Sequence, residues 1–286
     1  MKIDGKTKLF CVIGDPIEHT LSPAMHNAVF EGLRLNCVYT AFRIEPPILG
    51  DFVRCVKAMG LGGVNVTIPL KVAIIEHLDA LSEEAQIIGA VNTIKMGEKL
   101  IGHNTDGTGA MRALIQGGAD PKNKDVLILG SGGAARAVGV TLALMAEVSS
   151  LTILGIVEEE LKNLARDITS GTGVEVSWRL MDDETKVKLV GDADVIIHCT
   201  PMGMIPKVDQ TILTAEEIPS DIKLMDIVYT PLETRLMEEA KKAGVKTIIG
   251  GMEMFVNQGA EAERLWLDIE PPIELMREVV LGKLRG

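Results

Sequence analysis

A glycine-rich turn at residues 130–135 is the first pattern in this sequence that could bind a ligand. An apolar run at 125–129 leads into Gly130-Ser-Gly-Gly-Ala-Ala135, which matches GxGxxA, and helix-forming residues follow at once. Gly130 permits a tight turn, Gly132 lets the backbone approach a pyrophosphate, and Ala135 lets helix and strand pack closely. Free amides at the helix start add positive potential. The sequence therefore predicts a dinucleotide site, with a purely structural glycine turn as the alternative.

The end of the next expected strand chooses between NAD and NADP, because its tip faces the adenosine ribose. Here the strand ends in Leu154-Gly-Ile-Val157, which offers neither an arginine for a 2′-phosphate nor an acid for a free 2′-hydroxyl. Glu158 follows and could bind the hydroxyl, while Lys162 and Arg166 lie further along the expected helix. The same three residues could equally form an ordinary solvated helix face, so the preference stays open.

A second group of chemistry-bearing residues lies in the first third of the chain, where expected strands end. Hydroxyl, amide, imidazole and charged side chains gather in four segments, which are residues 14–27, 65–71, 89–93 and 102–107. Taken singly, these residues have simple structural roles. Lys71 after a Pro-Leu turn is typical of a solvated helix start, and Asp106 before a glycine is typical of a turn or N-cap.

The elements that must position both groups follow from hydrophobic periodicity. Short apolar runs alternate with longer segments of helical period, which predicts successive strand–helix units. Strands are expected at 9–13, 37–42 and 62–66, then at 125–129, 150–154, 195–198, 224–228 and 247–249. Helices are expected at 23–33 and 46–59, at 105–116 and 252–266 joining the two series, and at 272–284 packing back on the first.

The predicted fold class is α/β, with an N-terminal α/β substrate domain and a Rossmann-type doubly wound dinucleotide-binding domain, separated by a cleft. We expect residues 1–106 plus 255–286 to form the substrate-binding catalytic domain and residues 107–254 the dinucleotide-binding domain. The chain has 286 residues, of which 47% are apolar and only 3% aromatic, so its cores must consist mainly of aliphatic side chains. That composition suits buried parallel strands covered by helices.

Charge and cysteine usage exclude several classes of partner. A formal charge of −11 argues against binding to nucleic acid or to an anionic membrane. We find no signal peptide and no run of membrane-spanning length. The four cysteines are widely spaced, without metal-ligand spacing, so we expect reduced thiols, no metal site and a cytoplasmic location.

Taken together and in this order, the motifs resemble the shikimate dehydrogenase family from Phe10 to about Gln258. Besides the four polar segments, the resemblance includes Thr200-Pro-Met-Gly-Met204, Tyr229-Thr-Pro-Leu-Glu-Thr234 and the segment from Gly251 to Gln258. Each motif is short, but the ordered set is specific. The resemblance implies reversible, nicotinamide-dependent interconversion of shikimate and 3-dehydroshikimate.

The resemblance also implies roles for individual residues. Lys71 and Asp106 would form the catalytic pair, since a lysine beside a carboxylate can take the hydroxyl proton as hydride leaves. The substrate's hydroxyls and carboxylate would be held by Thr20, Ser22, Thr67, Asn92, Tyr229 and Gln258. The cofactor would be bound by Gly130, Ser131, Gly132, Gly133, Ala134, Thr200, Met202 and Gly251.

Three departures from the family pattern limit these implications. The family's usual Asn-Arg-Thr is replaced by Gly155-Ile156-Val157, so NADP is expected as the family default and NAD is not excluded. His198 replaces a frequent Asn and could alter a contact near the nicotinamide. Thr20 replaces a usual Ser, and its extra methyl could alter tolerance for quinate.

Two alternatives therefore stay open beside shikimate dehydrogenase. One is a quinate/shikimate dehydrogenase with NAD preference, and the other is a non-catalytic dinucleotide sensor. The expected partner is a small molecule, shikimate or a close hydroxy acid, and the expected assembly is a monomer or homodimer.

Overall fold

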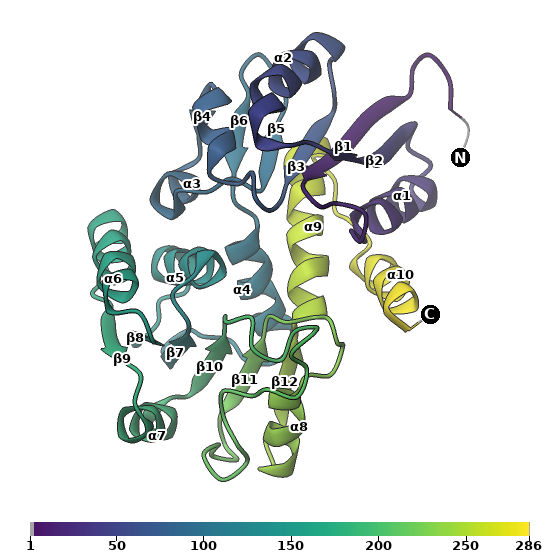
Figure 1. Ribbon diagram of the computed structural model, residues 1–286. Coiled ribbons are helices and arrows are strands. Elements are labelled where there is room, and N and C mark those ends of the chain that lie inside the picture. Colours follow the sequence, from purple (N-terminus) through teal and green to yellow (C-terminus); the bar gives the residue numbers. More distant parts are fainter. Residues whose placement is uncertain (1–2, 286) are drawn as a thin grey trace. The chain divides into compact units, whose positions relative to one another are not determined.

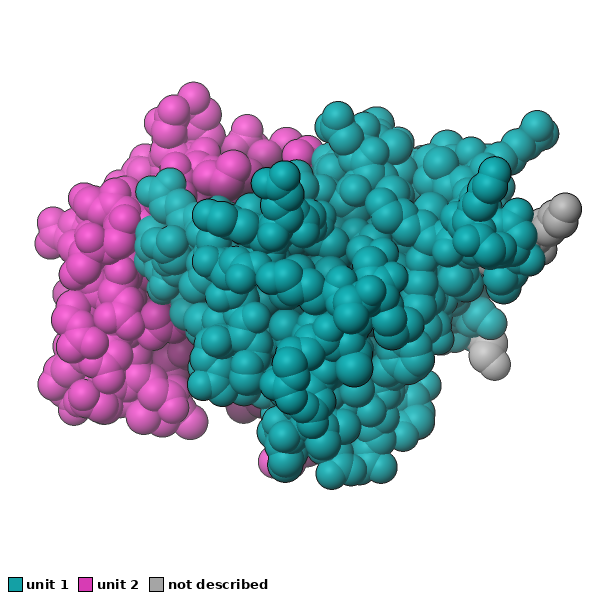
Figure 2. Space-filling view, turned by 90° about the horizontal axis from the view of Figure 1, so that it is seen from above, with its two compact units in different colours: residues 1–105, 258–286 teal, residues 106–257 magenta. Residues whose placement is uncertain are grey.

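The computed structural model describes residues 3–285 and divides the chain into two compact units, which Figure 2 shows in different colours. Unit 1 comprises Met1–Thr105 and Gln258–Gly286, and unit 2 comprises Asp106–Asn257. Each unit contains one six-stranded sheet with helices around it (Figure 1). The predicted α/β class is confirmed.

The sheet of unit 1 is mixed, with strand order β2-β1-β3-β5-β6-β4. Its strands are β1 (Lys8–Gly14), β2 (Cys37–Arg43), β3 (Gly63–Val66), β4 (Ala80–Leu81), β5 (Thr93–Lys95) and β6 (Ile101–His103). β1 runs parallel to β2 and β3, whereas β5 is antiparallel to both β3 and β6. The sequence predicted only β1 to β3, because β4, β5 and β6 are too short to show an apolar run.

The helices of unit 1 include three that the sequence predicted to within one residue of the observed bounds. They are α1 (Ser22–Gly32), α2 (Leu49–Met59), α3 (Glu83–Ile88), α9 (Gly251–Leu267), whose last ten residues belong to unit 1, and α10 (Ile273–Arg285). The predicted helix at 46–59 is instead a 3₁₀ turn, Pro46–Ile48, followed by α2, and a second 3₁₀ turn covers Ala73–His77. As predicted, the C-terminal helix α10 packs back on this unit, against α1.

Aromatic packing joins α9 to the sheet of unit 1. The indole of Trp266 lies 5.3 Å from the ring of Phe10, between ring centroids, and its Nε1 donates to the carbonyl of Ile94 at 3.0 Å. Gly63 on β3 has no side chain to collide with this indole. The contact therefore holds the C-terminal half of α9 on strands β1, β3 and β5.

The sheet of unit 2 is entirely parallel, with strand order β12-β11-β10-β7-β8-β9. Its strands are β7 (Asp125–Leu129), β8 (Ser150–Gly155), β9 (Ser177–Leu180), β10 (Val195–His198), β11 (Lys223–Asp226) and β12 (Thr247–Gly250). Counted along the unit, the order is 6-5-4-1-2-3, which is the doubly wound dinucleotide-binding order. The predicted Rossmann-type topology is confirmed, although the exposed edge strand β9 was missed.

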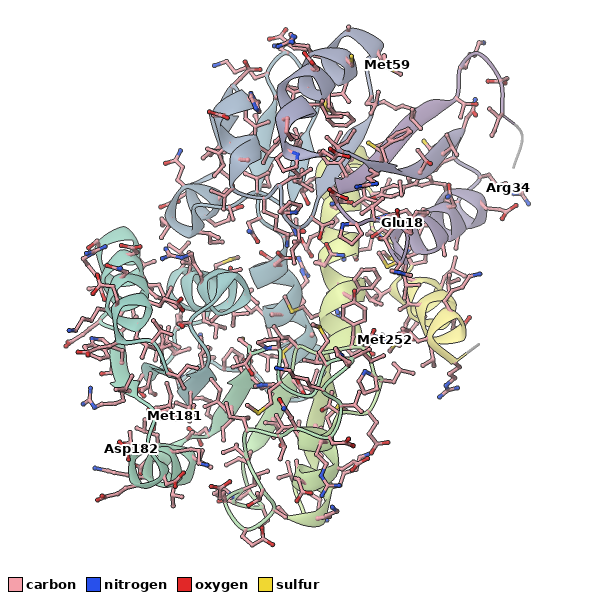
Figure 3. The ribbon with its side chains drawn as sticks, in the orientation of Figure 1. Glu18, Arg34, Met59, Met181, Asp182 and Met252 are labelled. Atoms are coloured by element: carbon pink, nitrogen blue, oxygen red, sulfur yellow. The ribbon has the colours of Figure 1, made fainter. Side chains whose placement is uncertain are left out.

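The remaining helices are α4 (Asp106–Gln116), α5 (Gly133–Met145), α6 (Glu158–Thr172), α7 (Asp183–Asp192) and α8 (Arg235–Lys242). The Asp182 carboxylate, labelled in Figure 3, caps α7 by accepting from the Thr185 amide at 2.8 Å. β11 ends at Asp226, two residues before the predicted end, because the Asp226 carboxylate accepts from the Val228 amide at 3.1 Å. This bond turns the chain out of the sheet.

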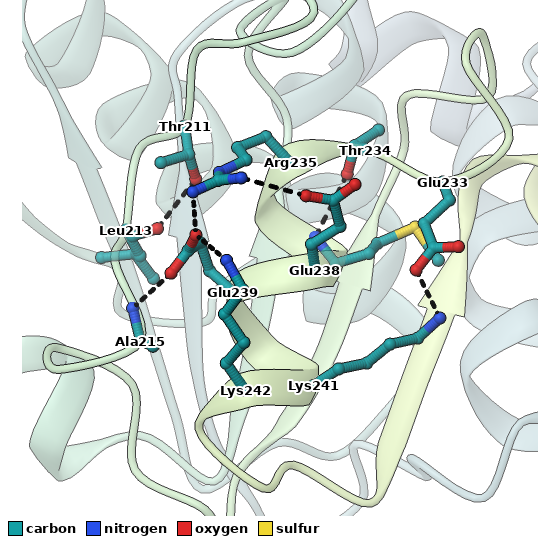
Figure 4. Close-up of polar contacts among 11 residues, drawn as sticks. Thr211, Leu213, Ala215, Glu233, Thr234, Arg235, Glu238, Glu239, Lys241 and Lys242 are labelled. Atoms are coloured by element: carbon teal, nitrogen blue, oxygen red, sulfur yellow. Dashed lines mark hydrogen bonds and ion pairs between the residues drawn. The ribbon is translucent and has the colours of Figure 1, made fainter.

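A long connection at residues 199–222 joins β10 to β11 without helix or strand. Glu239 of α8 holds it in place, since its Oε2 accepts from the Ala215 amide at 3.1 Å (Figure 4). The other oxygen of Glu239 pairs with Arg235 at 2.6 Å and Lys242 at 2.9 Å. Long loops on a doubly wound sheet commonly carry ligand-binding residues.

Within residues 3–285, none of the helices has both the length and the apolar character needed to cross a membrane.

Candidate active site

Strand direction gathers the predicted substrate residues of unit 1 at one edge of its sheet. Thr20 and Ser22 follow β1, and Thr67 and Lys71 follow β3, which is parallel to β1. Asn92 precedes β5, which is antiparallel to β3, so it lies at the same edge. Five residues from three separate segments of the chain therefore lie around the carboxyl ends of β1 and β3.

The loop after β1 is held by hydroxyl groups. Thr20 Oγ1 donates to Ser22 Oγ at 3.2 Å, and the Ser22 amide donates to Thr20 Oγ1 at 3.3 Å. Ser22 also hydrogen-bonds to the phenol of Tyr39. Glu18 of the same loop is exposed, and its carboxylate accepts from the Ile17 amide at 3.1 Å (Figure 3). Thr20 and Ser22 are thus part of one hydrogen-bonded chain.

Tyr39 continues that chain into the core of unit 1. Its hydroxyl donates to Asn65 Oδ1 at 2.6 Å, and its ring stacks on His26, with ring centroids 4.4 Å apart. Burial raises the pKa of Tyr39 well above its usual value, so the phenol remains a protonated donor. Sequence reasoning missed both Tyr39 and Asn65, although Asn65 opens the segment 65–71 that contains Lys71.

Asn92 is held by several buried hydrogen bonds. Its Oδ1 accepts from the Thr105 amide at 2.8 Å and from the Thr93 hydroxyl at 2.9 Å, and its Nδ2 donates to Thr105 Oγ1 at 3.0 Å. Asn65 Nδ2 donates to the Asn92 carbonyl at 3.2 Å. All four residues are buried, so each lost bond would leave a buried polar group unpaired.

A main-chain hydrogen bond joins Lys71 to the segment that contains Asn92. The carbonyl of Lys71 accepts from the Val91 amide at 2.8 Å, next to Asn92. Thr67 donates its amide to the Ile13 carbonyl at 2.9 Å, and Gly14 has no side chain to collide with Thr67 and Ile68. Asp106 directly follows Thr105 in the chain and is the first residue of α4.

Gln258 lies on the part of α9 that packs against α1. A methyl group at the neighbouring Gly259 would collide with Met25 of α1. One turn further along, Glu263 Oε1 lies 2.7 Å from His26 Nδ1, and both side chains are fully buried. These contacts hold Gln258 near the helix that begins at Ser22.

In unit 2, the glycine turn lies beside Thr200. Gly130 has a φ of +117°, which favours glycine, and a side chain there would come within 3.0 Å of the Thr200 methyl. Gly130 follows β7 and Thr200 follows β10, the two strands between which the chain order reverses. Doubly wound sheets bind their ligands at this reversal.

Gly132 and Gly133 lie beside open space. Gly132 caps α5 with no side-chain hydrogen bond, and a methyl group at Gly132 or Gly133 would enter open space. Neither backbone strain nor packing requires glycine at these positions. Both residues and half-buried Ala134 therefore leave the first amides of α5 accessible to a phosphate group, so the turn fits a dinucleotide.

The last predicted residues of unit 2 differ in role. A side chain at Gly251 would collide with the backbone of Ile227 and Val228, so this glycine allows α9 to start close to the end of β11. Tyr229 stacks on Phe255 of α9 with centroids 5.3 Å apart and stays 37% exposed. Half-buried Met252, labelled in Figure 3, lies on the same first turn of α9. The collision with Ile227 and Val228 thus gives Gly251 a packing role that does not depend on a ligand.

Comparison with known proteins decides the family. Two family models match, the shikimate dehydrogenase substrate binding domain over residues 12–94 and the shikimate 5'-dehydrogenase C-terminal domain over residues 251–281. A shikimate dehydrogenase (NADP(+)) from Methanosarcina mazei is 44% identical, over 98% of this chain and 99% of its own. The chain belongs to the shikimate dehydrogenase family. The resemblance that the motifs predicted is confirmed.

Two solved structures have the same fold as this family member. The shikimate 5-dehydrogenase from Listeria monocytogenes, in complex with shikimate and NAD, is 35% identical with a TM-score of 0.93, covering 98% of both chains. The quinate dehydrogenase from Corynebacterium glutamicum, in complex with NAD, is 30% identical with a TM-score of 0.87, covering 96% of this chain and 99% of its own. The family's solved members thus include enzymes named for two substrates.

His198, which departs from the family pattern, belongs to a buried hydrogen-bond network that the sequence did not predict. His198 Nδ1 lies 2.9 Å from Asp226 Oδ1, and its Nε2 hydrogen-bonds to Thr200 Oγ1. The Thr234 hydroxyl donates to Asp226 Oδ2, and the Met202 amide donates to Thr200 Oγ1 at 3.3 Å. His198 and Asp226 are opposite residues of β10 and β11, so only the strand register could have predicted their contact.

Proposed function

We propose that this protein is a shikimate dehydrogenase that interconverts shikimate and 3-dehydroshikimate with a nicotinamide dinucleotide as hydride carrier. The observation that carries the proposal is the hydrogen-bonded chain from Thr20 and Ser22 through Tyr39 and Asn65 to Asn92. Such a row of pre-oriented hydroxyl and amide groups suits a small acid with several hydroxyls, which must present one ring carbon to the hydride acceptor.

Lys71 and Asp106 are the proposed catalytic pair. Oxidation of the ring alcohol moves a hydride from its carbon to the nicotinamide and releases the hydroxyl proton, which a positioned base must accept. Support comes from the backbone on either side of Asn92, because Val91 bonds to the Lys71 carbonyl and Asn92 bonds to Thr105, which precedes Asp106. In the reverse direction the same pair returns the proton to the ketone oxygen.

The substrate's other groups have their own proposed partners. Hydroxyl and amide side chains that can bind the remaining hydroxyls and the carboxylate are Thr20, Ser22, Thr67, Asn92, Tyr229 and Gln258. Residues 1–106 plus 255–286 would act as the substrate-binding catalytic domain. An acid that lacks one of these hydroxyls would leave the corresponding protein group without a hydrogen bond, which is how such sites discriminate among hydroxy acids.

The bound dinucleotide supplies the hydride acceptor, and residues 107–254 would act as its domain. Its proposed contacts are Gly130, Ser131, Gly132, Gly133, Ala134, Thr200, Met202 and Gly251. The amides at the start of α5 would bind the pyrophosphate. Thr200, held by His198 and Met202, would lie at the reversal of strand order, where the nicotinamide half is expected.

We also propose that the enzyme acts in the cytoplasm as a monomer or homodimer. The four cysteines are unpaired, as thiols are in reducing compartments. Burial raises the pKa of Cys11 to about 12, which keeps this thiol protonated and unreactive. Light scattering of the purified protein at enzyme-assay concentrations gives the oligomeric state.

Initial rates of dinucleotide reduction test the proposed activity. Shikimate and quinate are each combined with NADP and with NAD, and reduced nicotinamide is followed by absorbance. We expect turnover of shikimate with at least one dinucleotide. Faster turnover of quinate would favour a quinate/shikimate dehydrogenase instead. The similarity to the quinate dehydrogenase and the Thr20 replacement support this second candidate. A folded protein that turns over neither acid would contradict both.

A further inference from the structure

The first turn of α6, just after β8, carries acidic side chains near the place where a cofactor's adenosine ribose is recognised. In doubly wound sheets the tip of the second strand, here β8, faces that ribose. After Gly155 come the exposed apolar residues Ile156 and Val157, and then Glu158, Glu159 and Glu160 in the first turn of α6. An NADP site needs a cation here for the 2′-phosphate, and this turn has none.

Glu160 is linked to the dinucleotide loop itself. The Ser131 hydroxyl, between Gly130 and Gly132, donates to Glu160 Oε2 at 2.7 Å. Acids in the first turn of a helix are favoured by the helix dipole, which accounts for Glu158 and Glu159 without any ligand. The helix dipole does not account for the bond from Ser131. This bond holds the Glu160 carboxylate against the loop that would bind the pyrophosphate.

The neighbouring cations are already engaged. The basic residues of β9, α6 and the first turn of α5 are Arg136, Lys162, Arg166 and Arg179. Arg136 and Arg166 both pair with Asp167, at 3.0 and 3.2 Å. Lys162 pairs with Glu158 at 2.7 Å and lies 5.5 Å above the centroid of the Trp178 ring.

Arg179 is the one cation of this group with a neutral partner. Its Nη1 donates to the Trp178 carbonyl at 2.7 Å, and its side chain is exposed on edge strand β9. A 2′-phosphate could recruit Arg179 only by breaking that bond. Even then, the 2′-phosphate would still face the Glu160 carboxylate at the dinucleotide loop.

We propose that Glu160 recognises the 2′ position of the adenosine ribose and makes this enzyme prefer NAD to NADP. The inference rests on the proposed dinucleotide site. A carboxylate accepts a hydrogen bond from a free 2′-hydroxyl, whereas a 2′-phosphate carries about −1.5 to −2 charges at neutral pH and is repelled by it. The family's solved members in complex with NAD show that this fold accepts that cofactor.

Fluorescence titration of NADH and NADPH, without substrate, measures the preference directly. We expect the wild type to bind NADH at least about tenfold more tightly, the worth of one hydrogen bond to a charged group. Glu160→Gln should lower the NADH to NADPH affinity ratio about tenfold, and Glu160→Arg should invert it. The matched control is Glu175→Gln, which removes the same charge from an exposed residue just beyond the C-terminal end of α6.

Three results would overturn the proposal. They are tighter binding of NADPH by the wild type, an affinity ratio unchanged in Glu160→Gln, or the same shift in Glu175→Gln. If the wild type prefers NADPH and Arg179→Ala abolishes that preference, Arg179 is the residue that recognises the 2′ position. Because binding is measured without substrate, selective NADH binding with no turnover of shikimate would count against the proposed reaction alone.

Discussion

The two units hold their predicted ligand-binding residues by opposite means. In unit 1, side chains fix one another, as in the bonds between the buried side chains of Asn92, Thr93 and Thr105. In unit 2, the central residues are glycines, and the space beside Gly132 and Gly133 is open. One site is defined by side chains that are present, and the other by side chains that are absent.

The difference follows from what each site is proposed to recognise. A small acid with several similar hydroxyls requires directional partners at fixed positions, which buried side-chain hydrogen bonds supply. A pyrophosphate is recognised by charge and by main-chain amides, so a side chain only obstructs it. Deleting polar groups should therefore damage the function of unit 1, whereas adding a methyl group should damage that of unit 2.

The largest effect is expected from Lys71→Ala, which removes the proposed base. Its kcat for shikimate should fall by about 10²–10⁴-fold, the usual worth of general acid–base catalysis, with little change in dinucleotide affinity. Steady-state kinetics measures the fall, and Lys99→Ala, an exposed lysine of the same unit, is the matched control. Near-native turnover of Lys71→Ala would remove Lys71 from the mechanism.

Tyr39→Phe breaks the polar chain of unit 1 while keeping its aromatic packing. Asn65 Oδ1 would lose the donor that now lies 2.6 Å away, so the free energy of unfolding should fall by about 1–3 kcal/mol. Shikimate affinity should fall about tenfold because Ser22 and Asn65 lose their common partner. Urea unfolding and calorimetric titration measure the two effects. Unchanged shikimate affinity would make Tyr39 a packing residue only.

Much of the fold was predictable, and the two units differ in how much. Strands 125–129 and 195–198 were predicted at their observed bounds because each contains at least three consecutive buried aliphatic residues. In unit 1, β5 and β6 have three residues each, too few for periodicity to show. The mixed character of that sheet was therefore invisible in the sequence.

The same contrast holds for the sites. The glycine turn is a local pattern, so its strand, turn and helix could be predicted together. Partners such as Tyr39 and Asn65, or His198 and Asp226, are 26 and 28 residues apart and meet only through strand pairing. Reasoning from residue types found the groups that could contact a ligand but not the residues that hold them.

Two glycine substitutions in the dinucleotide loop separate two effects of an added side chain, which are backbone strain and obstruction of the dinucleotide. Gly132→Ala places its methyl in open space at a φ of −75°, so stability should change by less than about 0.5 kcal/mol while dinucleotide affinity falls about tenfold. Gly130→Ala imposes a φ of +117° on alanine and should cost about 1 kcal/mol or more in stability. Thermal unfolding and NADH titration separate the two. Unimpaired dinucleotide binding by Gly132→Ala would contradict the proposed pyrophosphate contact.

The smallest effect concerns the loop that carries Thr200. A hydrogen bond from Lys242, then one from the Ala215 amide and the charge of Arg235, hold the pKa of Glu239 below its ordinary 4.5. A lowered carboxyl pKa stabilises the fold above 4.5, and this contribution is lost as pH falls through the lower folded value. The stability advantage of wild type over Glu239→Gln should therefore shrink below pH 4.5.

Urea unfolding at several pH values measures that advantage, with Glu238→Gln as control because the pair that Glu238 makes with Arg235 is exposed (Figure 4). A pH-independent difference between wild type and Glu239→Gln would show that the Glu239 charge does not stabilise the loop.

The central claim, that this chain moves a hydride between the ring alcohol of shikimate and a nicotinamide, is tested most directly by isotope transfer. Shikimate carrying deuterium at the carbon of the reacting alcohol is incubated with enzyme and oxidised dinucleotide, and the reduced dinucleotide is analysed by mass spectrometry. The account predicts one deuterium in each reduced dinucleotide and formation of this product about 10²–10⁴-fold more slowly by Lys71→Ala. Reduced dinucleotide without deuterium, or none formed by folded enzyme, would contradict it.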